Sequence, residues 1–418
     1  MQTLKGDMAV ASMPKTGSNL KHWSISGVLM ICVVLAFFDK ISIAVLFSDP
    51  TFQTVMGIGD DKTKLGWLMT SFLLAYGFSS IFLSMAGDLV NPKKCLTACV
   101  VLWGVLMALM GMAKSYEQLL VLRVLLGVAE GPLFALAYTI VKQCYSPHQI
   151  ARASTMFLLG TPIGAALGFP ITAYVLANYG WQMTFFVMAA LTVVVVAVVV
   201  LGLRDVQLKT GAELNAGKKK MDWQQHIANC KVLFGARAFW AVCLFNTALL
   251  TYLWGLNGWL PSYLIEAKGI NLKEFGSISS LPFIAMLFGE VAGAFLSDKT
   301  GKRAAQVFGG LLMAGIAMAA VPLIESPMLT ILAMSISAMS WGFGVASVFA
   351  LLARVSPDNV SATAGGVFNG FGNFAGAAAP VLMGYIVTQT GNFDNGIMFL
   401  VVIAIVGSLV LLPLIKKY

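Results

Sequence analysis

Apolar runs long enough to cross a membrane recur along the whole chain of 418 residues. A membrane-crossing helix needs ~20 predominantly apolar residues, because the hydrocarbon core of a bilayer is about 30 Å thick. Within that core every backbone N–H and C=O must be paired inside the segment, which a helix achieves. The sequence therefore predicts an all-α membrane protein with twelve transmembrane helices. The predicted spans are 25–47, 65–87, 95–113, 118–142, 152–177, 182–203, 238–262, 276–297, 304–324, 327–352, 360–387 and 396–415.

The distribution of Lys and Arg predicts how these spans are oriented. The chain has 27 Lys and Arg against 18 Asp and Glu, a net charge of +9. With the N-terminus inside, 20 of the 27 fall in inner segments and five in outer loops. An excess of Lys and Arg marks cytoplasmic loops, so both termini are expected in the cytoplasm of a bacterial cell with the chain in the inner membrane. The basic charge is thus explained by topology, which argues against nucleic-acid binding.

Two pairs of residues recur at the same spacing and predict a duplicated chain. Asp88 and Asp298 end the second and eighth spans, and Pro170 and Pro380 lie in the fifth and eleventh; both pairs are 210 residues apart. Six spans in each half make the halves parallel repeats, related by an axis along the membrane normal. The predicted parts are an N-tail (1–23), an N-terminal six-helix half (24–203), a basic cytoplasmic linker (204–237) expected to touch anionic lipid, and a C-terminal six-helix half (238–418).

Four ionisable residues interrupt two otherwise apolar spans. Asp39 and Lys40 lie in the first span, and Arg123 and Glu130 lie in the fourth. Placing each of these charged side chains at membrane depth costs at least ~2.5–3.5 kcal/mol, so each is expected to have a partner or a function there. Arg123 and Glu130 are seven residues apart, which places them on one helix face about 10 Å apart. The four charges sum to zero, and they form either structural salt bridges between helices or the lining of a path for a polar substrate; the pattern favours the path.

The second half carries neutral polar and aromatic groups instead of charges. Its acidic residue within a span, Glu290, lies two turns from Asp298 and so near the inner surface. The polar and aromatic candidates are Tyr252, Asn257, Trp341, Asn369 and Asn373. Six cysteines in spans or inner segments predict no disulfide, and three histidines without ligand spacing predict no metal site. No nucleophile–base pair is evident, so neither an enzyme nor a cofactor is expected.

The loops after the second and eighth spans resemble a motif of the major facilitator superfamily, an aspartate followed by a basic cluster. The first copy contains Asp88, Lys93 and Lys94, and the second runs from Ser297 to Arg303. The resemblance covers essentially the whole chain and implies two six-helix halves. It also implies a role in gating for these loops. The residues concerned are Asp88, Lys93, Lys94, Glu290, Asp298, Lys302 and Arg303.

Within that superfamily the chain resembles the anion:cation symporters, among them sugar-acid permeases and vesicular glutamate carriers. The resemblance rests on Phe38-Asp39-Lys40, on Arg123 with Glu130, on the segment Trp259–Leu264, and on Phe368-Asn369 with Asn373. It implies that Arg123 and Lys40 hold a substrate carboxylate while Glu130 and Asp39 couple its movement to protons. Other expected substrate contacts are Tyr76, Thr161, Tyr252, Asn257, Trp341, Asn369 and Asn373. The chain departs from the family by having Lys40 for arginine and Thr161 for glutamine.

The sequence therefore predicts proton-coupled symport of a small organic anion by a monomer in the lipid bilayer, with the proton as coupling ion and no cofactor. One alternative is an exporter, or an importer of zwitterions such as amino acids, in which Glu130 binds a substrate ammonium. Another is a transporter-like sensor, which requires a docking surface on the inner side. The segment 204–237 is the candidate for that surface.

Overall fold

The computed structural model describes residues 19–59, 61–83, 91–145, 153, 156–208, 231–345, 347–356 and 361–417, and these ranges contain helices and no strands. The helices of the first half are α1 (Asn19–Leu46), α2 (Pro50–Val55), α3 (Lys62–Phe82), α5 (Pro92–Gly111), α6 (Tyr116–Glu130), α7 (Leu133–Cys144), α9 (Gly160–Tyr179) and α10 (Trp181–Gly202). Those of the second half are α13 (Arg237–Ser262), η2 (Tyr263–Ala267), α14 (Leu272–Ile278), α15 (Leu281–Thr300), α16 (Arg303–Ala319), η3 (Val321–Leu323), α17 (Pro327–Val345), α18 (Val348–Val355), α19 (Ser361–Thr390), α20 (Phe393–Leu409) and η5 (Leu412–Leu414).

Eleven helical segments of the described chain are long and apolar enough to cross a membrane. They correspond to eleven of the twelve predicted spans. The second predicted span, 65–87, is represented by the 21-residue helix α3, which lies beside α6 and α19. An all-helical membrane fold is thus confirmed, and the count of twelve spans stays a prediction.

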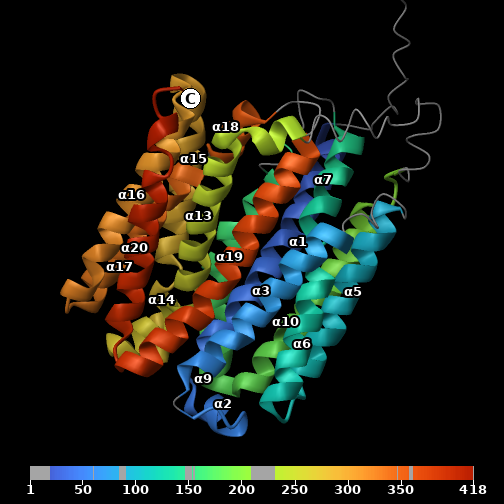
Figure 1. Ribbon diagram of the computed structural model, residues 1–418. Coiled ribbons are helices and arrows are strands. Elements are labelled where there is room, and N and C mark those ends of the chain that lie inside the picture. The colour runs from blue at the N-terminus through green and yellow to red at the C-terminus, as the bar shows by residue number, and fades with distance from the viewer. Residues whose placement is uncertain are drawn as a thin grey trace, which may run out of the picture.

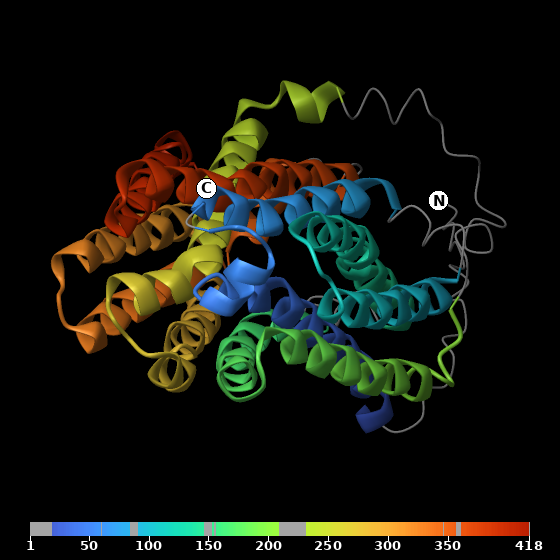
Figure 2. The ribbon, with the colours of Figure 1, turned by 90° about the horizontal axis from the view of Figure 1, so that it is seen from below.

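The helices form two groups that lie side by side (Figures 1 and 2). In the N-half, helices α1–α10, α1 packs against α9 and α10, and α3 packs against α6. In the C-half, helices α13–α20, α13 packs against α19 and α20, and α16 packs against α17. The groups meet where α3 lies along α19, where α9 contacts α14 and α15, and where α1 contacts α13. The boundaries predicted for the halves and for the linker stay predictions, because 209–230 lie outside the described residues.

Polar contacts join the two groups at the end of the molecule that holds α2, called here the α2 end (Figure 1). Lys62 Nζ lies 2.7 Å from a carboxylate oxygen of Glu266. The Ser48 and Ser262 hydroxyls are 3.1 Å apart. The repeat-related prolines lie at matching junctions: the Pro170 backbone faces Gly276 of α14, and the Pro380 backbone packs tightly on Gly66 of α3. The α2 end is therefore closed by contacts between the halves.

Three predicted spans are divided by local breaks. Pro132 follows Gly131 and separates α6 from α7, because proline lacks the N–H that would continue the helical pattern. Ser279 and Ser280 separate α14 from α15, so the eighth span begins earlier than the predicted 276 and is bent. In the tenth span α17 ends at Val345 and α18 begins at Val348, after the turn residue Ser347. Hydropathy alone does not reveal such breaks, because the apolar character continues through them.

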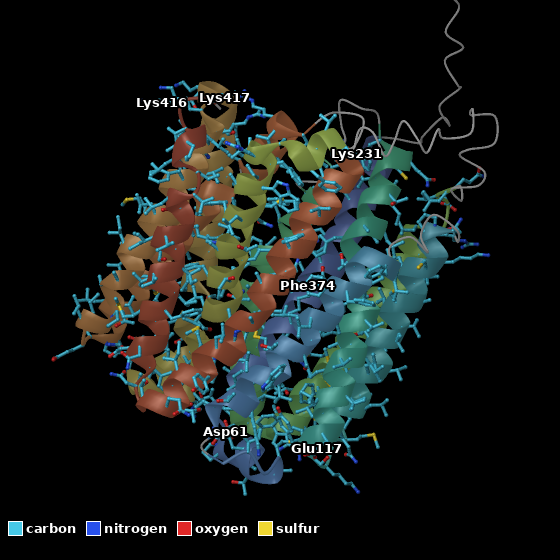
Figure 3. The ribbon with its side chains drawn as sticks, in the orientation of Figure 1. Asp61, Glu117, Lys231, Phe374, Lys416 and Lys417 are labelled. Atoms are coloured by element: carbon cyan, nitrogen blue, oxygen red, sulfur yellow. The ribbon has the colours of Figure 1, made fainter. Side chains whose placement is uncertain are left out.

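Large apolar side chains are exposed around the outside of the helix bundle. Examples are Val193 on α10 and Phe295 on α15, which are 68% and 77% exposed. Figure 3 places Phe374 at mid-height on α19, with Lys231, Lys416 and Lys417 at the end opposite α2. An apolar belt of this kind is suited to lipid contact. The predicted orientation places lysines at the cytoplasmic end, and these three lysines agree with it. The orientation itself stays a prediction.

Candidate functional site

Charged residues of α1 and α6 meet in the interior of the N-half. Lys40 Nζ lies 3.6 Å from a carboxylate oxygen of Glu130, and the two side chains are 1% and 0% exposed. The same ammonium lies 4.2 Å from the centre of the Tyr76 ring on α3. A cation over an aromatic face is attracted by the electrons of the ring. Three of the predicted site residues, Lys40, Tyr76 and Glu130, therefore form one buried cluster.

Arg123 lies on α6 nearer the α2 end and is fully buried. Its Nε donates a hydrogen bond to the backbone carbonyl of Leu68 at 3.0 Å, and its guanidinium carbon lies 4.4 Å from the centre of the Phe72 ring. One terminal nitrogen, Nη2, is buried without a hydrogen-bond partner among the described residues. Arg123 has no acidic side chain within 4 Å in that same part of the chain. The guanidinium is held in place and still has an unused donor, as an anion-binding group requires.

Asp39, next to Lys40 on α1, is the fourth buried charged residue, and it interacts electrostatically with Lys40, Arg123 and Glu130. Its side chain is 1% exposed, and both carboxylate oxygens lack a hydrogen-bond partner in the described part of the chain. Burying an ionised carboxylate without a paired cation or donor is costly. The alternative of purely structural salt bridges accounts for the Lys40–Glu130 pair, and it leaves Asp39 and the free nitrogen of Arg123 unexplained.

Glycines position these charged residues by letting the helices approach closely. Gly127 of α6 packs against the backbone of Phe72, where the methyl group of an alanine would overlap the Phe72 carbonyl oxygen. Gly131 packs similarly against the carbonyl of Tyr76. Small residues at helix interfaces are the usual means of close packing within a membrane. The face of α6 that carries Arg123 and Glu130 is thereby pressed against α3.

The C-half contributes a pocket lined by three of the predicted residues, Tyr252, Asn257 and Trp341. The Tyr252 hydroxyl is hydrogen-bonded to Ser337, and the Trp341 indole N–H donates to the Leu249 carbonyl at 3.2 Å. Asn257 is fully buried, and both polar atoms of its amide lack a partner among the described residues. Asn257 is thus the polar group that the pocket leaves free.

Two aromatic rings connect the charged cluster to the C-half. Phe37 of α1 stacks on Trp254 of α13, with ring centres 5.7 Å apart, and Lys40 Nζ lies 5.8 Å from the centre of the Phe37 ring. Arg123 and the pocket also lie near the same level of helix α3. Arg123 bonds to Leu68 of α3, and Gly258, next to Asn257, packs on the adjacent Met69. The stacking of Phe37 on Trp254 therefore brings the charged cluster against the C-half, whereas the pocket around Asn257 is lined by residues of α13, α15 and α17.

Among the other predicted contact residues, Thr161 lies apart from this cluster, whereas Asn373 of α19 packs on Gly77, the neighbour of Tyr76. Thr161 lies beside Gly160, which packs on Val33, whereas the neighbours of Lys40 pack on Gly168. Thr161 is therefore about two turns, or ~10 Å, from the level of Lys40. The Asn373 amide donates to the backbone carbonyl and the side-chain oxygen of Asn369, both at 3.0 Å. These asparagines share a face, as predicted from their spacing, and they satisfy each other in part.

Two of the residues predicted for gating, Lys93 and Arg303, make structural contacts at the end opposite α2. Lys93 Nζ donates to the Leu203 carbonyl at 2.9 Å and so caps the end of α10. Arg303 donates to the Ala350 carbonyl at 3.0 Å, while Lys302 precedes α16 and Lys94 is exposed. Glu290 is partly buried in the middle of α15, and Asp298 lies in the last turn of that helix. Asp88 lies outside the described residues.

Several residues of the site escape prediction from sequence. Phe72 and the Leu68 carbonyl hold Arg123, and Phe37 with Trp254 connects the halves. Apolar side chains and backbone carbonyls carry no signal in a sequence composed largely of such groups. For Phe37 a weak signal exists, because it lies three residues before Lys40 and so on the same helix face.

Comparisons with known proteins agree with this architecture. A family model described as Major Facilitator Superfamily matches residues 29–380. A Cupriavidus necator protein named "probable sulfoacetate transporter SauU" is 27% identical, with 92% of each chain covered. The hexuronate transporter of Bacillus subtilis is 25% identical, covering 93% of each chain. An Escherichia coli protein named "probable galactarate/D-glucarate transporter GudP" is 24% identical, covering 97% of this chain and 96% of that protein.

Solved structures give the same fold. A bacterial homologue of the human lysosomal transporter Spinster superposes with a TM-score of 0.79 at 19% identity, covering 96% of this chain and 98% of that one. The nucleoside transporter NupG superposes with a TM-score of 0.68 at 17% identity, covering 95% and 98%. The relatives are named as transporters and not as enzymes, and those named for organic acids agree with the resemblance to anion symporters. By the family match and the fold together, the chain belongs to the Major Facilitator Superfamily and is a multi-pass membrane transporter.

Proposed function

We propose that this protein imports a small organic anion across the bacterial inner membrane together with protons. The observation that carries the proposal is Arg123, a buried guanidinium with a free donor, held by a backbone carbonyl and an aromatic ring. Arginine presents a planar fork that matches a carboxylate or sulfonate. Relatives named for sulfoacetate, hexuronate and galactarate support an organic-acid substrate.

Charge balance supplies the coupling between anion and proton. The two acids and two bases of the cluster sum to zero, so an anion entering alone adds an uncompensated charge to a buried site. Protonation of Glu130 removes its competition for Lys40, whose ammonium then becomes available to the substrate. One proton on Glu130 thus offsets one negative charge of the substrate. Anion and proton favour each other's binding, so anion affinity rises as the pH falls.

Alternating access completes the proposed cycle. In the structure the halves are joined at the α2 end, which we assign to the outer side. The site lies between the halves, as it does in transporters built from two repeats. Separation of the halves at the α2 end admits the anion and its proton from outside. When the halves close again at the α2 end, the anion and the proton are released toward the inner side.

Glu130→Gln tests the proposal, because the amide mimics the protonated acid permanently. Purified variant and parent are reconstituted in proteoliposomes with a labelled short carboxylate. Exchange of labelled for unlabelled substrate should persist in the variant, since the amide does not compete for Lys40. Accumulation driven by a proton gradient should disappear, because no proton can be released to reset the empty carrier. The increase of affinity at low pH should flatten for the same reason.

Two other outcomes would count against the proposal. Gradient-driven accumulation that survives in Glu130→Gln removes Glu130 from the coupling and leaves Asp39 as the acid to vary. Exchange and accumulation that fall together, with a lower unfolding temperature, indicate a structural Lys40–Glu130 bridge. Uptake of labelled amino acids in place of carboxylates would support zwitterion import, in which Glu130 binds the ammonium.

A further inference from the structure

Two buried polar groups on one face of α13 have no partner among the described residues. They are the side-chain amide of Asn257 and the indole N–H of Trp254, which is 4% exposed. Residues three apart on a helix are neighbours on its surface. Asn246 of the same helix behaves differently, because its amide donates to the Phe368 carbonyl at 2.9 Å. Buried polar groups are nearly always paired, so Asn257 and Trp254 point to a ligand.

The remainder of the pocket around Asn257 is apolar. Its wall contains Leu253, Leu256, Phe283, Met286 and Met334. The polar atoms of Tyr252 and Trp341 are already bonded to Ser337 and to the Leu249 carbonyl. The free volume of the pocket is about 10 Å³, room for about one water-sized group. The pocket therefore offers one free amide, that of Asn257, on an otherwise apolar and small surface, and the unpaired indole N–H of Trp254 lies about one turn away on α13.

The pocket is lined by residues of the C-half, and two sets of contacts relate it to the charged residues of the N-half. Arg123 and Gly258, the neighbour of Asn257, contact the successive residues Leu68 and Met69 of α3. Trp254 stacks on Phe37, the residue that also borders Lys40. A molecule between the halves can therefore present its anionic group to the N-half and its other end to Asn257.

Resting on the proposed function, we propose that the substrate is a short carboxylate with one further neutral hydrogen-bonding group on an apolar body, such as a hydroxy acid. Asn257 and Trp254 recognise that group, and the apolar wall rejects acids with many hydroxyls. Each hydroxyl buried without a partner loses its hydrogen bonds to water. This chain thus differs in selectivity from the relatives named for hexuronate and galactarate, whose substrates carry several hydroxyls.

A panel of three monocarboxylates tests the proposal. Propionate has no hydroxyl, lactate has one and D-galactonate has five, and the affinity of the purified protein for each is measured by titration in detergent. Lactate should bind about tenfold more tightly than propionate, the value of one well-made hydrogen bond. D-galactonate should bind at least tenfold more weakly than lactate.

Variants assign this selectivity to residues. Asn257→Leu should reduce the ratio of lactate to propionate affinity to about one, and Trp254→Phe should reduce it partly while keeping the stacking on Phe37. Asn246→Leu is the matched control, because it removes an asparagine whose amide is already bonded; its ratio should equal that of the parent. Thermal unfolding shows whether each variant is folded, and the panel on the parent protein needs no variant.

The outcomes separate this proposal from the one on which it rests. D-galactonate binding more tightly than lactate, or a ratio unchanged in Asn257→Leu, overturns the proposed selectivity and leaves anion transport standing. Failure of all three acids to bind the parent protein also overturns the proposed selectivity, whereas anion transport is tested separately by uptake in proteoliposomes. A ratio that falls equally in Asn257→Leu and Asn246→Leu also overturns the assignment to Asn257.

Discussion

Four ionisable side chains in the N-half are almost completely shielded from solvent, yet they are not equally compensated. Lys40 and Glu130 form an ion pair, Arg123 bonds to a backbone carbonyl, and Asp39 has no hydrogen-bond partner among the described residues. A cluster built only for stability would satisfy each charge, since an uncompensated buried charge is costly. The free donor of Arg123 is therefore where the anion is expected to bind.

Arg123→Ala should remove anion binding while the protein still folds. The buried guanidinium has no acidic partner within 4 Å in the described chain, so its loss breaks no close ion pair. Charge-assisted hydrogen bonds contribute about 1.5–3 kcal/mol, which predicts a loss of affinity of at least tenfold. Arg123→Lys keeps the charge without the planar fork and should retain part of the affinity. Binding isotherms and thermal unfolding check both variants, and unchanged binding in Arg123→Ala would place the site elsewhere.

Lys40 and Glu130 should show strong coupling in a double-mutant cycle. Lys40→Ala leaves the Glu130 carboxylate buried without its cation, and breaking a buried pair in this way costs about 3–5 kcal/mol. Combining Lys40→Ala with Glu130→Gln removes both charges and should recover much of that stability. Lys40→Arg should keep partial transport. The measurement is thermal unfolding of the parent and the variants in one detergent; purely additive effects would show that the pair does not interact.

At the scale of single helices, the site depends on how closely α6 approaches α3. Gly127 and Gly131 face the backbone of α3 at Phe72 and Tyr76, the residues whose rings contact Arg123 and Lys40. The same contact therefore sets both the distance between the helices and the position of the charged groups. Pro132 then ends α6 directly after Glu130, at the position where Gly131 packs on α3.

Gly127→Ala should damage binding without touching a charged residue. The added methyl group meets the Phe72 carbonyl and forces α6 away from α3. We expect a loss of about 1–3 kcal/mol of stability, typical of overpacking, together with weaker anion binding. Gly309→Ala on α16 is the matched control, since nothing lies within 4 Å of its added methyl, and it should be neutral or slightly stabilising. Equal behaviour of the two variants would show that the close packing of α6 on α3 is unimportant.

At the scale of the whole molecule, the contacts at the α2 end decide which way the site can open. Lys62 and Glu266 come from different halves, and their side chains are 13% and 28% exposed. Around them, Tyr263 donates to Asp394 at 2.8 Å and Trp259 donates to the Pro380 carbonyl at 2.8 Å. The Lys62–Glu266 ion pair joins the two halves. The other two hydrogen bonds lie within the C-half.

Glu266→Gln should make the α2 end open more often. A partly exposed ion pair contributes about 0.2–1 kcal/mol, so we expect a shift of at most a few-fold in the population of the open state. The readout is the labelling rate of a cysteine that replaces Ser262, which is fully buried at the contact between the halves, by a membrane-impermeant reagent. Exchanging the two charges, Lys62→Glu with Glu266→Lys, should restore the slow rate. Fast labelling of the exchanged pair would show that the ion pair does not hold this end closed.

Much of the architecture was predictable because lipid imposes a simple rule on composition. The apolar runs predicted eleven of the helical spans now seen, and the charged interruptions at Lys40, Arg123 and Glu130 predicted residues that cluster. Contacts between individual residues were predicted less well than the spans. Thr161 was expected at the site from the resemblance, and it lies about two helical turns from the level of Lys40. How far one helix is shifted along its neighbour depends on side-chain packing, which the sequence does not show.

The sequence by itself determined that the chain is an all-helical membrane protein whose N-half carries charge and whose C-half carries neutral polar groups, because burial in lipid makes each of those residues exceptional. Only the tertiary structure decided that Lys40 pairs with Glu130, that Arg123 keeps a free donor, and that Asn257 is unpaired while Asn246 is bonded. Two asparagines eleven residues apart on one helix look alike in the sequence. Their difference arises from which carbonyls and side chains the neighbouring helices bring within hydrogen-bonding distance, and that distance depends on the whole packing of the bundle.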